Sequence, residues 1–238
     1  MNVTDKQVQQ KREKVGQMFD GIAHRYDLLN HLLSAGIDKS WRKVLIRGLA
    51  MYKPTDILDV ATGTADLAIM AAGIEGTTVT GCDISENMLT EGRRKILRKG
   101  LEGRIRIYNS PAESLMFAGN TFDAVMVAFG VRNFADLGKG LTEMHRVLKP
   151  GGRVHILEFS MPRLPVVKQV YRFYFKKILP HAGGMVSGSS TAYQYLPDTV
   201  MKFPEGKVFV KLMEDAGFTS VETNRLSMGI ATIYRAVK

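Results

Sequence analysis

The chain has 238 residues, 45% of them hydrophobic, which is enough to bury one full-sized core, so a single domain with additions is expected. Lys and Arg (33) outnumber Asp and Glu (23), which gives a net charge of +10. Such a charge indicates binding to nucleic acid, to anionic lipid or to an acidic substrate, or else a surface that is merely basic. The single Cys82 excludes a disulfide framework, and no Cys or His pair has the spacing of a zinc site. No apolar run reaches the ~20 residues that span a bilayer, and the charged N-terminus is unlike a signal peptide. We therefore expect a cytoplasmic protein without a metal site.

The first fifty residues predict a helical cap that precedes the sheet. Residues 1–17 are polar and basic, which predicts a frayed or conditionally ordered helix. From Val15 to Leu49 apolar residues recur at helical spacing, with a break around Gly36.

The segment from Asp56 to Ala68 predicts a strand, a turn of small residues and the start of a helix. This is the nucleotide-binding opening of an α/β sheet, with ligand groups over the helix N-terminus. Asp83 ends the next predicted strand, about 20 residues beyond Gly63, where a carboxylate accepts hydrogen bonds from ribose hydroxyls. The turn has one glycine rather than the three of a dinucleotide fingerprint. It therefore favours an adenosine ligand without phosphates, S-adenosylmethionine, over NAD.

Strands and helices alternate through the middle of the chain, which predicts a parallel sheet wound by helices on both faces. Ligands in such sheets bind outside the carboxyl ends of the strands, where Gly63, Asp83 and the loops at 110–112 and 128–133 should converge. The predicted strands lie near 56–60, 78–82, 104–108, 123–128 and 153–158, and the helices near 65–73, 85–99 and 136–148.

The pattern changes after Phe159. A proline-led, basic and aromatic segment followed by a Gly/Ser-rich stretch predicts an insertion over the sheet, at about 161–205. A last helix and an antiparallel hairpin should close the chain, with the helix at about 205–216 and the strands at about 219–225 and 228–236, joined at Leu226-Ser227.

Three long, position-specific stretches are Tyr26–Trp41, Phe129–Asn133 and Arg146–Ser160. Together they resemble the signatures of the quinone-biosynthesis C-methyltransferases, and the resemblance runs from about Gly16 onwards. It implies the class I S-adenosylmethionine-dependent methyltransferase fold, which is Rossmann-like with a mostly parallel seven-stranded sheet and an antiparallel C-terminal hairpin. The chain would then divide into an N-terminal helical cap, a methyltransferase domain and a substrate-side helical insertion after the fifth strand, at 1–50, 51–238 and about 161–205.

The resemblance also implies an activity and cofactor contacts. The family methylates demethylmenaquinol with S-adenosylmethionine, and some members also methylate a methoxy-polyprenyl-benzoquinol. Instead of contacting the cofactor, Thr64 could be a helix N-cap and Asp83 could be a turn residue at the end of a strand. Two departures from the family are Ala65, where a second glycine is usual, and Asp38, where many members carry a histidine. The implied cofactor-binding residues are Gly63, Thr64, Asp83, Pro111, Ala112 and Ala128.

A quinol ring carbon becomes nucleophilic when an adjacent hydroxyl loses its proton, so the site needs a proton acceptor or a cation that stabilises the phenolate. We assign Arg132 to the quinol oxygen, with Asn133 as its hydrogen-bonding neighbour, and Tyr26 to closing over the ring. The alternatives are that Tyr26 packs in the core and that Arg132 only pairs with Asp136.

The basic charge has a candidate location in a helix at about 165–179. There Lys168, Arg172 and Lys176 form a stripe beside an apolar face. The helix either docks on the sheet or sits in lipid headgroups on the inner face of the cell membrane, where the enzyme collects its polyprenyl quinol. An RNA or other small-molecule methyltransferase is the alternative function, although no clustered basic groove supports nucleic acid. A NAD oxidoreductase and a non-catalytic binding module are less favoured, and a homodimer stays open.

Overall fold

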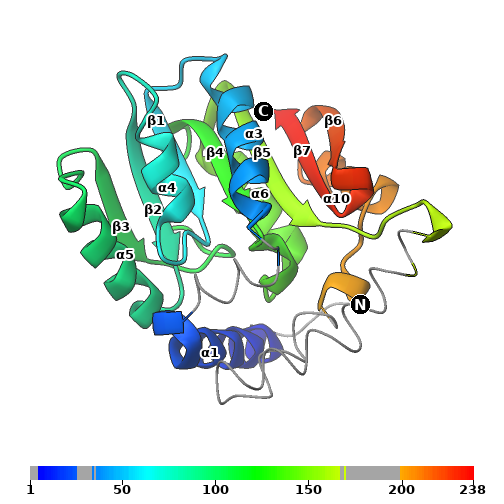
Figure 1. Cartoon of the computed structure of the whole chain (residues 1–238), viewed down its shortest axis with the longest axis horizontal. Helices are drawn as coiled ribbons and strands as arrows, with labels where there is room; N and C mark the ends of the chain where they lie inside the picture. The colour runs from blue at the N-terminus through cyan, green and yellow to red at the C-terminus, as the bar shows by residue number, and fades with distance from the viewer. Residues whose placement is uncertain (1–4, 26–33, 35, 167–168, 170–198) are drawn as a thin grey trace.

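A computed structural model describes residues 5–25, 34, 36–166, 169 and 199–238 (Figure 1). The described strands form one seven-stranded sheet in the order β3-β2-β1-β4-β5-β7-β6. Neighbouring strands are parallel except at β7, which runs antiparallel to β5 and β6. This confirms the mostly parallel sheet with an antiparallel C-terminal hairpin. The strands are β1 (Asp56–Val60), β2 (Thr78–Asp83), β3 (Ile105–Asn109), β4 (Phe122–Ala128), β5 (Leu148–Phe159), β6 (Thr219–Leu226) and β7 (Ala231–Val237).

Helices cover both faces of this sheet. The face with α3, α4 and α5 and the face with α6 and α10 enclose separate hydrophobic cores, because the central strands are apolar on both sides. No described helix combines the length and apolar character needed to cross a membrane. The described helices are α1 (Asp5–Ile22), α3 (Asp38–Ala50), α4 (Asp66–Ala71), α5 (Glu86–Arg98), α6 (Leu137–Val147) and α10 (Lys207–Asp215), with short 3₁₀ turns η1 (Ala23–Arg25), η2 (Val131–Asn133) and η4 (Ser227–Gly229).

The start of β5 differs from the sequence prediction, which placed it near residue 153. The strand begins at Leu148, which pairs with Phe122, and its register with β4 shifts before Arg153. The intervening Pro-Gly-Gly stretch bulges, with Gly151 at φ +75°, and its backbone exchanges hydrogen bonds with Lys238 at the end of the chain. The Pro-Gly-Gly stretch is therefore a bulge inside β5, a strand that begins directly where α6 ends at Val147.

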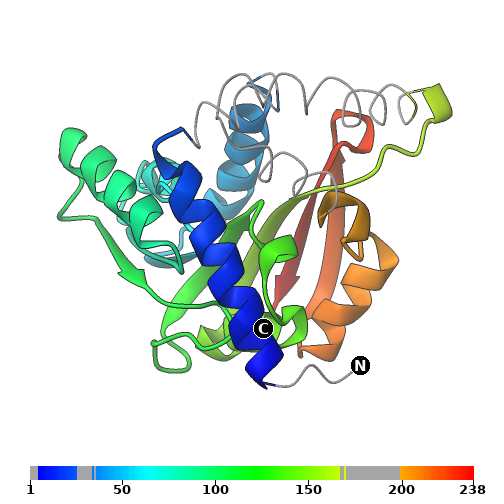
Figure 2. The same cartoon turned by 90° about the horizontal axis from the view of Figure 1, so that it is seen from below.

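The N-terminal segment forms the helix α1 where the sequence predicted a frayed or conditionally ordered helix. This helix lies across the carboxyl edge of the parallel strands (Figure 2). Polar side chains dock its two ends. Asp20 accepts hydrogen bonds from the Ser85 hydroxyl (2.6 Å) and from the backbone N–H of Asn87 (3.1 Å), and Lys11 donates to the Phe134 carbonyl (2.7 Å). The polarity that predicted fraying supplies these contacts.

The other helix of the predicted cap, α3, packs directly on the sheet. Its buried Trp41, Leu45 and Leu49 belong to the same core as β1 and β4. Tyr26 lies outside the described residues. Of the predicted insertion the structure describes 161–166, 169 and 199–205.

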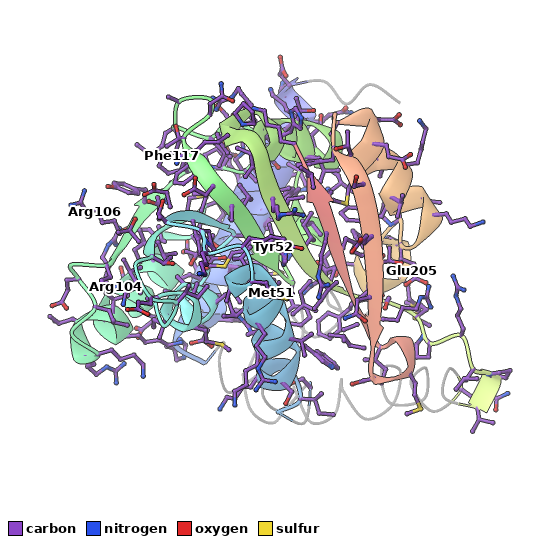
Figure 3. The ribbon with its side chains drawn as sticks, turned by 90° about the horizontal axis from the view of Figure 1, so that it is seen from above. Met51, Tyr52, Arg104, Arg106, Phe117 and Glu205 are labelled. Carbon is purple, nitrogen blue, oxygen red and sulfur yellow. The ribbon has the colours of Figure 1, made fainter. Side chains whose placement is uncertain are left out.

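The opposite edge of the sheet, which carries the amino ends of the parallel strands, is viewed in Figure 3. There α3 leads through Met51 and Tyr52 towards β1, and the Arg153 guanidinium lies 3.7 Å from the centroid of the Tyr52 ring. Burial and the nearby Arg235 lower the pKa of His155 to about 3, so this histidine is neutral at physiological pH.

Candidate active site at the carboxyl edge

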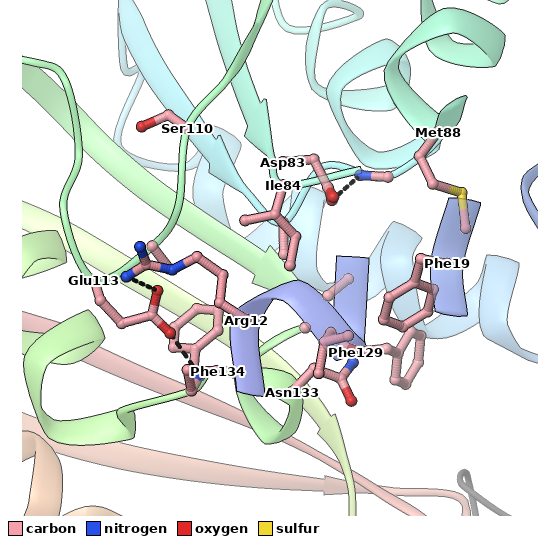
Figure 4. A pocket seen from close by; sticks show the side chains of 17 residues that line it. Arg12, Phe19, Asp83, Ile84, Met88, Ser110, Glu113, Phe129, Asn133 and Phe134 are labelled. Atoms are coloured by element: carbon pink, nitrogen blue, oxygen red, sulfur yellow. Dashed lines mark hydrogen bonds and ion pairs between the residues drawn. The ribbon is translucent and has the colours of Figure 1, made fainter. Parts of the chain in front are cut away.

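The main cavity lies where the strand order reverses, between β1 and its neighbours β2 and β4, which is where open α/β sheets bind ligands. Figure 4 shows this cavity from close by. Its empty volume is about 640 Å³. The loops after β1, β2, β3 and β4 form its floor and sides, and α1 contributes Arg12, Val15 and Phe19 as a further wall. The sequence predicted the converging loops but missed the α1 wall, although the helical spacing from Val15 onwards was a signal for it.

Asp83 connects two of the loops. Its carboxylate accepts a hydrogen bond from the backbone N–H of Gly63 (2.9 Å) and another from that of Ser85 (2.9 Å). Burial raises the pKa of Asp83, although these N–H donors oppose the rise. The structure thus shows the turn role of Asp83 and places its residue in the cavity lining, while its ligand contact stays a prediction.

The loops after β1 and β4 touch each other at the floor of the cavity. A Cβ atom on Gly130 would lie 2.6 Å from the Ala61 Cβ, so only glycine fits there. Ala61 and Ala65 adopt left-handed backbone angles, with φ of +55° and +65°. Ala65 thus occupies, at some strain, the conformation that a second glycine would adopt freely.

A smaller adjoining cavity of about 300 Å³ shares Ala61, Gly63 and Ala128 with the main one. Asp59 lines it, at 1% exposure, and accepts a hydrogen bond from the Thr62 hydroxyl (2.7 Å). Burial raises the pKa of Asp59 to about 7; Asp83 adds to the rise, whereas the Thr62 hydroxyl and Arg42 oppose it. Sequence reasoning missed Asp59, although an acidic residue inside an apolar run was a signal that could have identified it.

We expect Asp59→Asn to stabilise the ligand-free protein at alkaline pH. The neutral carboxyl favours the folded state, so this contribution is complete below the ordinary pKa of 3.8 and is lost as pH rises through about 7. The variant, which never ionises, should therefore gain up to roughly 4 kcal/mol over the wild type at pH 9 and little at pH 4. Urea unfolding at the two pH values measures this, and a pH-independent difference would contradict a buried, ionising Asp59.

Of the predicted cofactor residues, Gly63, Asp83, Ala112 and Ala128 line the main cavity. Thr64 lines the smaller one, where its hydroxyl accepts a hydrogen bond from Lys95 (2.9 Å), and the N-cap position of α4 is Ala65 instead. Pro111 is absent from both sets of described lining residues, whereas its two neighbours along the chain line the main cavity.

Arg132 and Asn133 differ in position. Asn133 lines the main cavity, whereas the buried Arg132 guanidinium donates to Glu158 (2.6 Å) and to the Phe129 carbonyl (2.6 Å). Phe129 adopts a left-handed φ of +61°, rare for a bulky residue. Asp136 caps α6 by accepting from the Lys139 N–H, so the ion pair of Arg132 is with Glu158 rather than with Asp136.

Glu113 is a further buried acid in the main cavity that sequence reasoning missed. It accepts hydrogen bonds from the backbone N–H groups of Ala135 and Asp136, and it forms an ion pair with Arg12 of α1 at 3.5 Å. Glu113 thereby joins the loop after β3 to the loop after β4 and to the α1 wall. Among the described residues no group of three or more His, Cys, Asp or Glu could hold a metal ion.

Solved structures with the same fold include methyltransferases and one enzyme of another class. A SAM-dependent methyltransferase from Thermotoga maritima superposes with a TM-score of 0.64 at 17% identity, covering 93% of this chain and 99% of that one. The [4+2]-cyclase SpnF superposes with a TM-score of 0.61 at 16% identity, covering 94% of each chain. At these identities the likeness shows the class I methyltransferase fold and leaves the reaction open.

Sequence relatives are far closer. A demethylmenaquinone methyltransferase from Bacteroides fragilis is 47% identical over 229 residues, covering 96% of this chain and 94% of its own length. A ubiquinone/menaquinone biosynthesis C-methyltransferase UbiE from Geotalea daltonii is 46% identical over 231 residues, covering 96% and 98%. The sequence model of the ubiE/COQ5 methyltransferase family matches residues 6–238. The match spans the α1 wall, both cavities and the C-terminal hairpin, and the chain belongs to the ubiE/COQ5 methyltransferase family.

Proposed function

We propose that the protein transfers a methyl group from S-adenosylmethionine to a ring carbon of demethylmenaquinol, the last step of menaquinone biosynthesis. The relatives from Bacteroides fragilis and Chlorobaculum parvum, 47% and 44% identical, carry the demethylmenaquinone activity in their names. Relatives named for both ubiquinone and menaquinone biosynthesis support a methoxy-polyprenyl-benzoquinol as a second candidate substrate. The observation that carries the proposal is the Asp83–Gly63 contact inside a cavity at the strand-order reversal.

The residues of the two cavities fit S-adenosylmethionine. The Asp83 carboxylate accepts backbone N–H groups at both oxygens and has about four lone-pair sites, so it retains acceptor capacity for a ribose diol. Ile84, Met88 and Ala112 give the main cavity an apolar surface for adenine. When bound, S-adenosylmethionine supplies an activated methyl group, so the protein mainly aligns donor and acceptor.

We assign the activation of the quinol to Asn133 and Arg132. The buried Oδ1 of Asn133 and the buried Nε of Arg132 have no hydrogen-bond partner in the described part of the chain, which supports a polar ligand group nearby. Asn133 would accept the hydrogen bond of a quinol hydroxyl, and when that proton passes to water the Arg132 cation would stabilise the resulting phenolate, electrostatically or through a bound water. Tyr26, which the structure does not describe, keeps its proposed role of closing over the ring.

Methyl transfer to a soluble, short-chain demethylmenaquinol tests this function. The purified protein and S-adenosylmethionine should give a product about 14 Da heavier than the substrate by mass spectrometry. This is the mass added when a methyl group replaces a ring hydrogen. The benzoquinol precursor and a bulk RNA substrate, assayed in parallel, separate the second substrate and the alternative class. Methylation of RNA without methylation of either quinol would overturn the proposal.

We also propose that this cytoplasmic enzyme docks peripherally on the membrane that holds its quinol. Leu164 and Val166, at the start of the basic segment at about 165–179, are 55% and 73% exposed and add to its apolar character. The protein should co-sediment with anionic vesicles at low salt, less at high salt and hardly with neutral vesicles, since each Lys or Arg contributes ~1 kcal/mol. Charge reversal at Lys168, Arg172 and Lys176 should abolish this binding.

The matched control reverses three exposed cations of α5 instead, Arg93, Arg94 and Arg98. It changes net charge equally, so it should leave sedimentation largely intact if the 165–179 segment is the docking surface. The segment variant should slow turnover of a long-chain quinol more than that of a short-chain analogue. Equal sedimentation of the two variants would place the membrane contact elsewhere.

A further inference from the structure

The smaller cavity contains a buried charge that the proposed chemistry does not use. Arg42 of α3 lines it, and this residue is 7% exposed in a helix whose other cations face solvent. Among the described lining residues of this cavity, Arg42 is the one cation. A guanidinium withdrawn from water requires a compensating partner.

The protein compensates Arg42 only in part. Its Nε lies 3.6 Å from an oxygen of Asp38, too far for a hydrogen bond, and this Nε has no hydrogen-bond partner in the described structure. The guanidinium carbon lies 5.5 Å from the centre of the Phe129 ring, which is a weaker contact. Arg42 therefore lines the cavity with at least one guanidinium donor unfilled, and a guanidinium matches the geometry of a carboxylate.

The remaining charges of the cavity complement Arg42. Asp59 lines the cavity from β1, and Asp66 lines it at the start of α4, where the ammonium group of Lys95 neutralises it at 2.6 Å. Asp59 accepts hydrogen bonds from the Thr62 hydroxyl and from the backbone N–H of Ala68, and Arg42 is the nearby cation that lowers its pKa. The Arg42 guanidinium and the Asp59 carboxyl thus line a space that adjoins the main cavity, a donor and an acceptor such as an α-amino-acid head group requires.

On the basis of the proposed S-adenosylmethionine site, we propose that Arg42 binds the carboxylate of the methionyl head group and so selects a cofactor with an intact amino-acid end. The position agrees with the order of the cavities: Gly63 and Ala128 line both, so a ligand whose ribose meets Asp83 extends its sulfonium side chain past them towards Arg42. Arg42 is a binding and specificity residue in this account, and the reacting methyl group lies elsewhere.

The test compares two ligands that differ in the head group. S-adenosylhomocysteine has the amino-acid end, whereas 5′-methylthioadenosine shares the adenosine and lacks it. By calorimetry, Arg42→Gln should weaken S-adenosylhomocysteine roughly 10- to 100-fold, the range for a hydrogen bond to a charged group, and leave 5′-methylthioadenosine within about twofold. Arg47→Gln, an exposed arginine on the same helix, is the matched control and should change neither affinity.

Each outcome decides a separate point. Equal weakening of both ligands by Arg42→Gln would make Arg42 structural, and no weakening of either would place the carboxylate elsewhere. If the wild-type protein binds neither ligand, the proposed function itself is overturned. If Arg42→Gln does not fold, the wild-type protein alone provides the test. It should bind S-adenosylhomocysteine at least about tenfold more tightly than decarboxylated S-adenosylhomocysteine, which keeps the amine but lacks the carboxyl group. Equal affinities for the two ligands would overturn the inference.

Discussion

Replacing Arg132 with Gln should lower the free energy of unfolding by about 3–5 kcal/mol, the cost of leaving a buried ion-pair partner uncompensated. The Glu158 side chain is 0% exposed and would keep only its backbone donors, chiefly the N–H of Phe159 at 2.8 Å. Burial raises the pKa of Glu158 and Arg132 opposes the rise, so without the arginine the carboxyl should take up a proton. The stability of the variant should therefore fall as pH rises, which urea unfolding at pH 5 and pH 8 measures.

A second variant separates this structural role from catalysis. Arg132→Gln combined with Glu158→Gln replaces the ion pair with two amides of similar size, so the stability should largely return. If Arg132 stabilises the phenolate, turnover should stay at least about tenfold low in the double variant while the affinity for S-adenosylhomocysteine barely moves. Arg132→Lys, which keeps the charge but loses the planar fork, should show the same split. Recovery of turnover together with stability would leave Arg132 a purely structural residue.

Asp83→Ala should weaken S-adenosylmethionine binding by ~1.5–3 kcal/mol, the scale of hydrogen bonds to a charged group. The structure adds a second cause, because the same carboxylate holds the N–H groups of Gly63 and Ser85 and so fixes the loops after β1 and β2. The fold should survive, since Asp83 ends a strand at the sheet edge. Calorimetry with S-adenosylhomocysteine measures the loss.

Asp83→Asn is the control for the loop contribution. The amide keeps one oxygen that accepts from a backbone N–H but loses the charge, so its affinity should fall between those of the wild type and of Asp83→Ala. Wild-type affinity in a folded Asp83→Ala would leave Asp83 with the turn role alone. An Asn variant as weak as the Ala variant would assign the whole loss to the carboxylate's charge.

The sheet was predictable from sequence because its strands are short apolar runs bounded by turn residues. Strands β1 to β4 lie within about two residues of their predictions, and the C-terminal hairpin and the helices α4, α5, α6 and α10 were found as well. The early start of β5 was not, since a Pro-Gly-Gly stretch is typical of a turn and is a bulge here only because the chain terminus pairs with it. A local pattern carries no information about a partner nearly ninety residues away, as the Gly151–Lys238 pairing shows.

The site was predictable where its residues follow strands. Gly63, Asp83, Ala112, Ala128 and Asn133 reach the main cavity because parallel strands end at one edge. The Arg132–Glu158 pair and the place of Arg42 beside Asp59 depend on contacts between distant elements, which spacing along the chain does not reveal. The membrane segment and the role of Tyr26 stay predictions, because they lie outside the described residues.

The attachment of α1 has a consequence for how the protein is made. Lys11 contacts a carbonyl 123 positions later in the chain, and Arg12 contacts a carboxylate 101 positions later. The ribosome therefore releases α1 well before the surfaces that receive it, and the helix carries too few buried side chains to be stable alone. During synthesis the contacts of Asp20 with Ser85 and Asn87 become available first, and the wall of the main cavity closes only after β4 and its following loop have emerged.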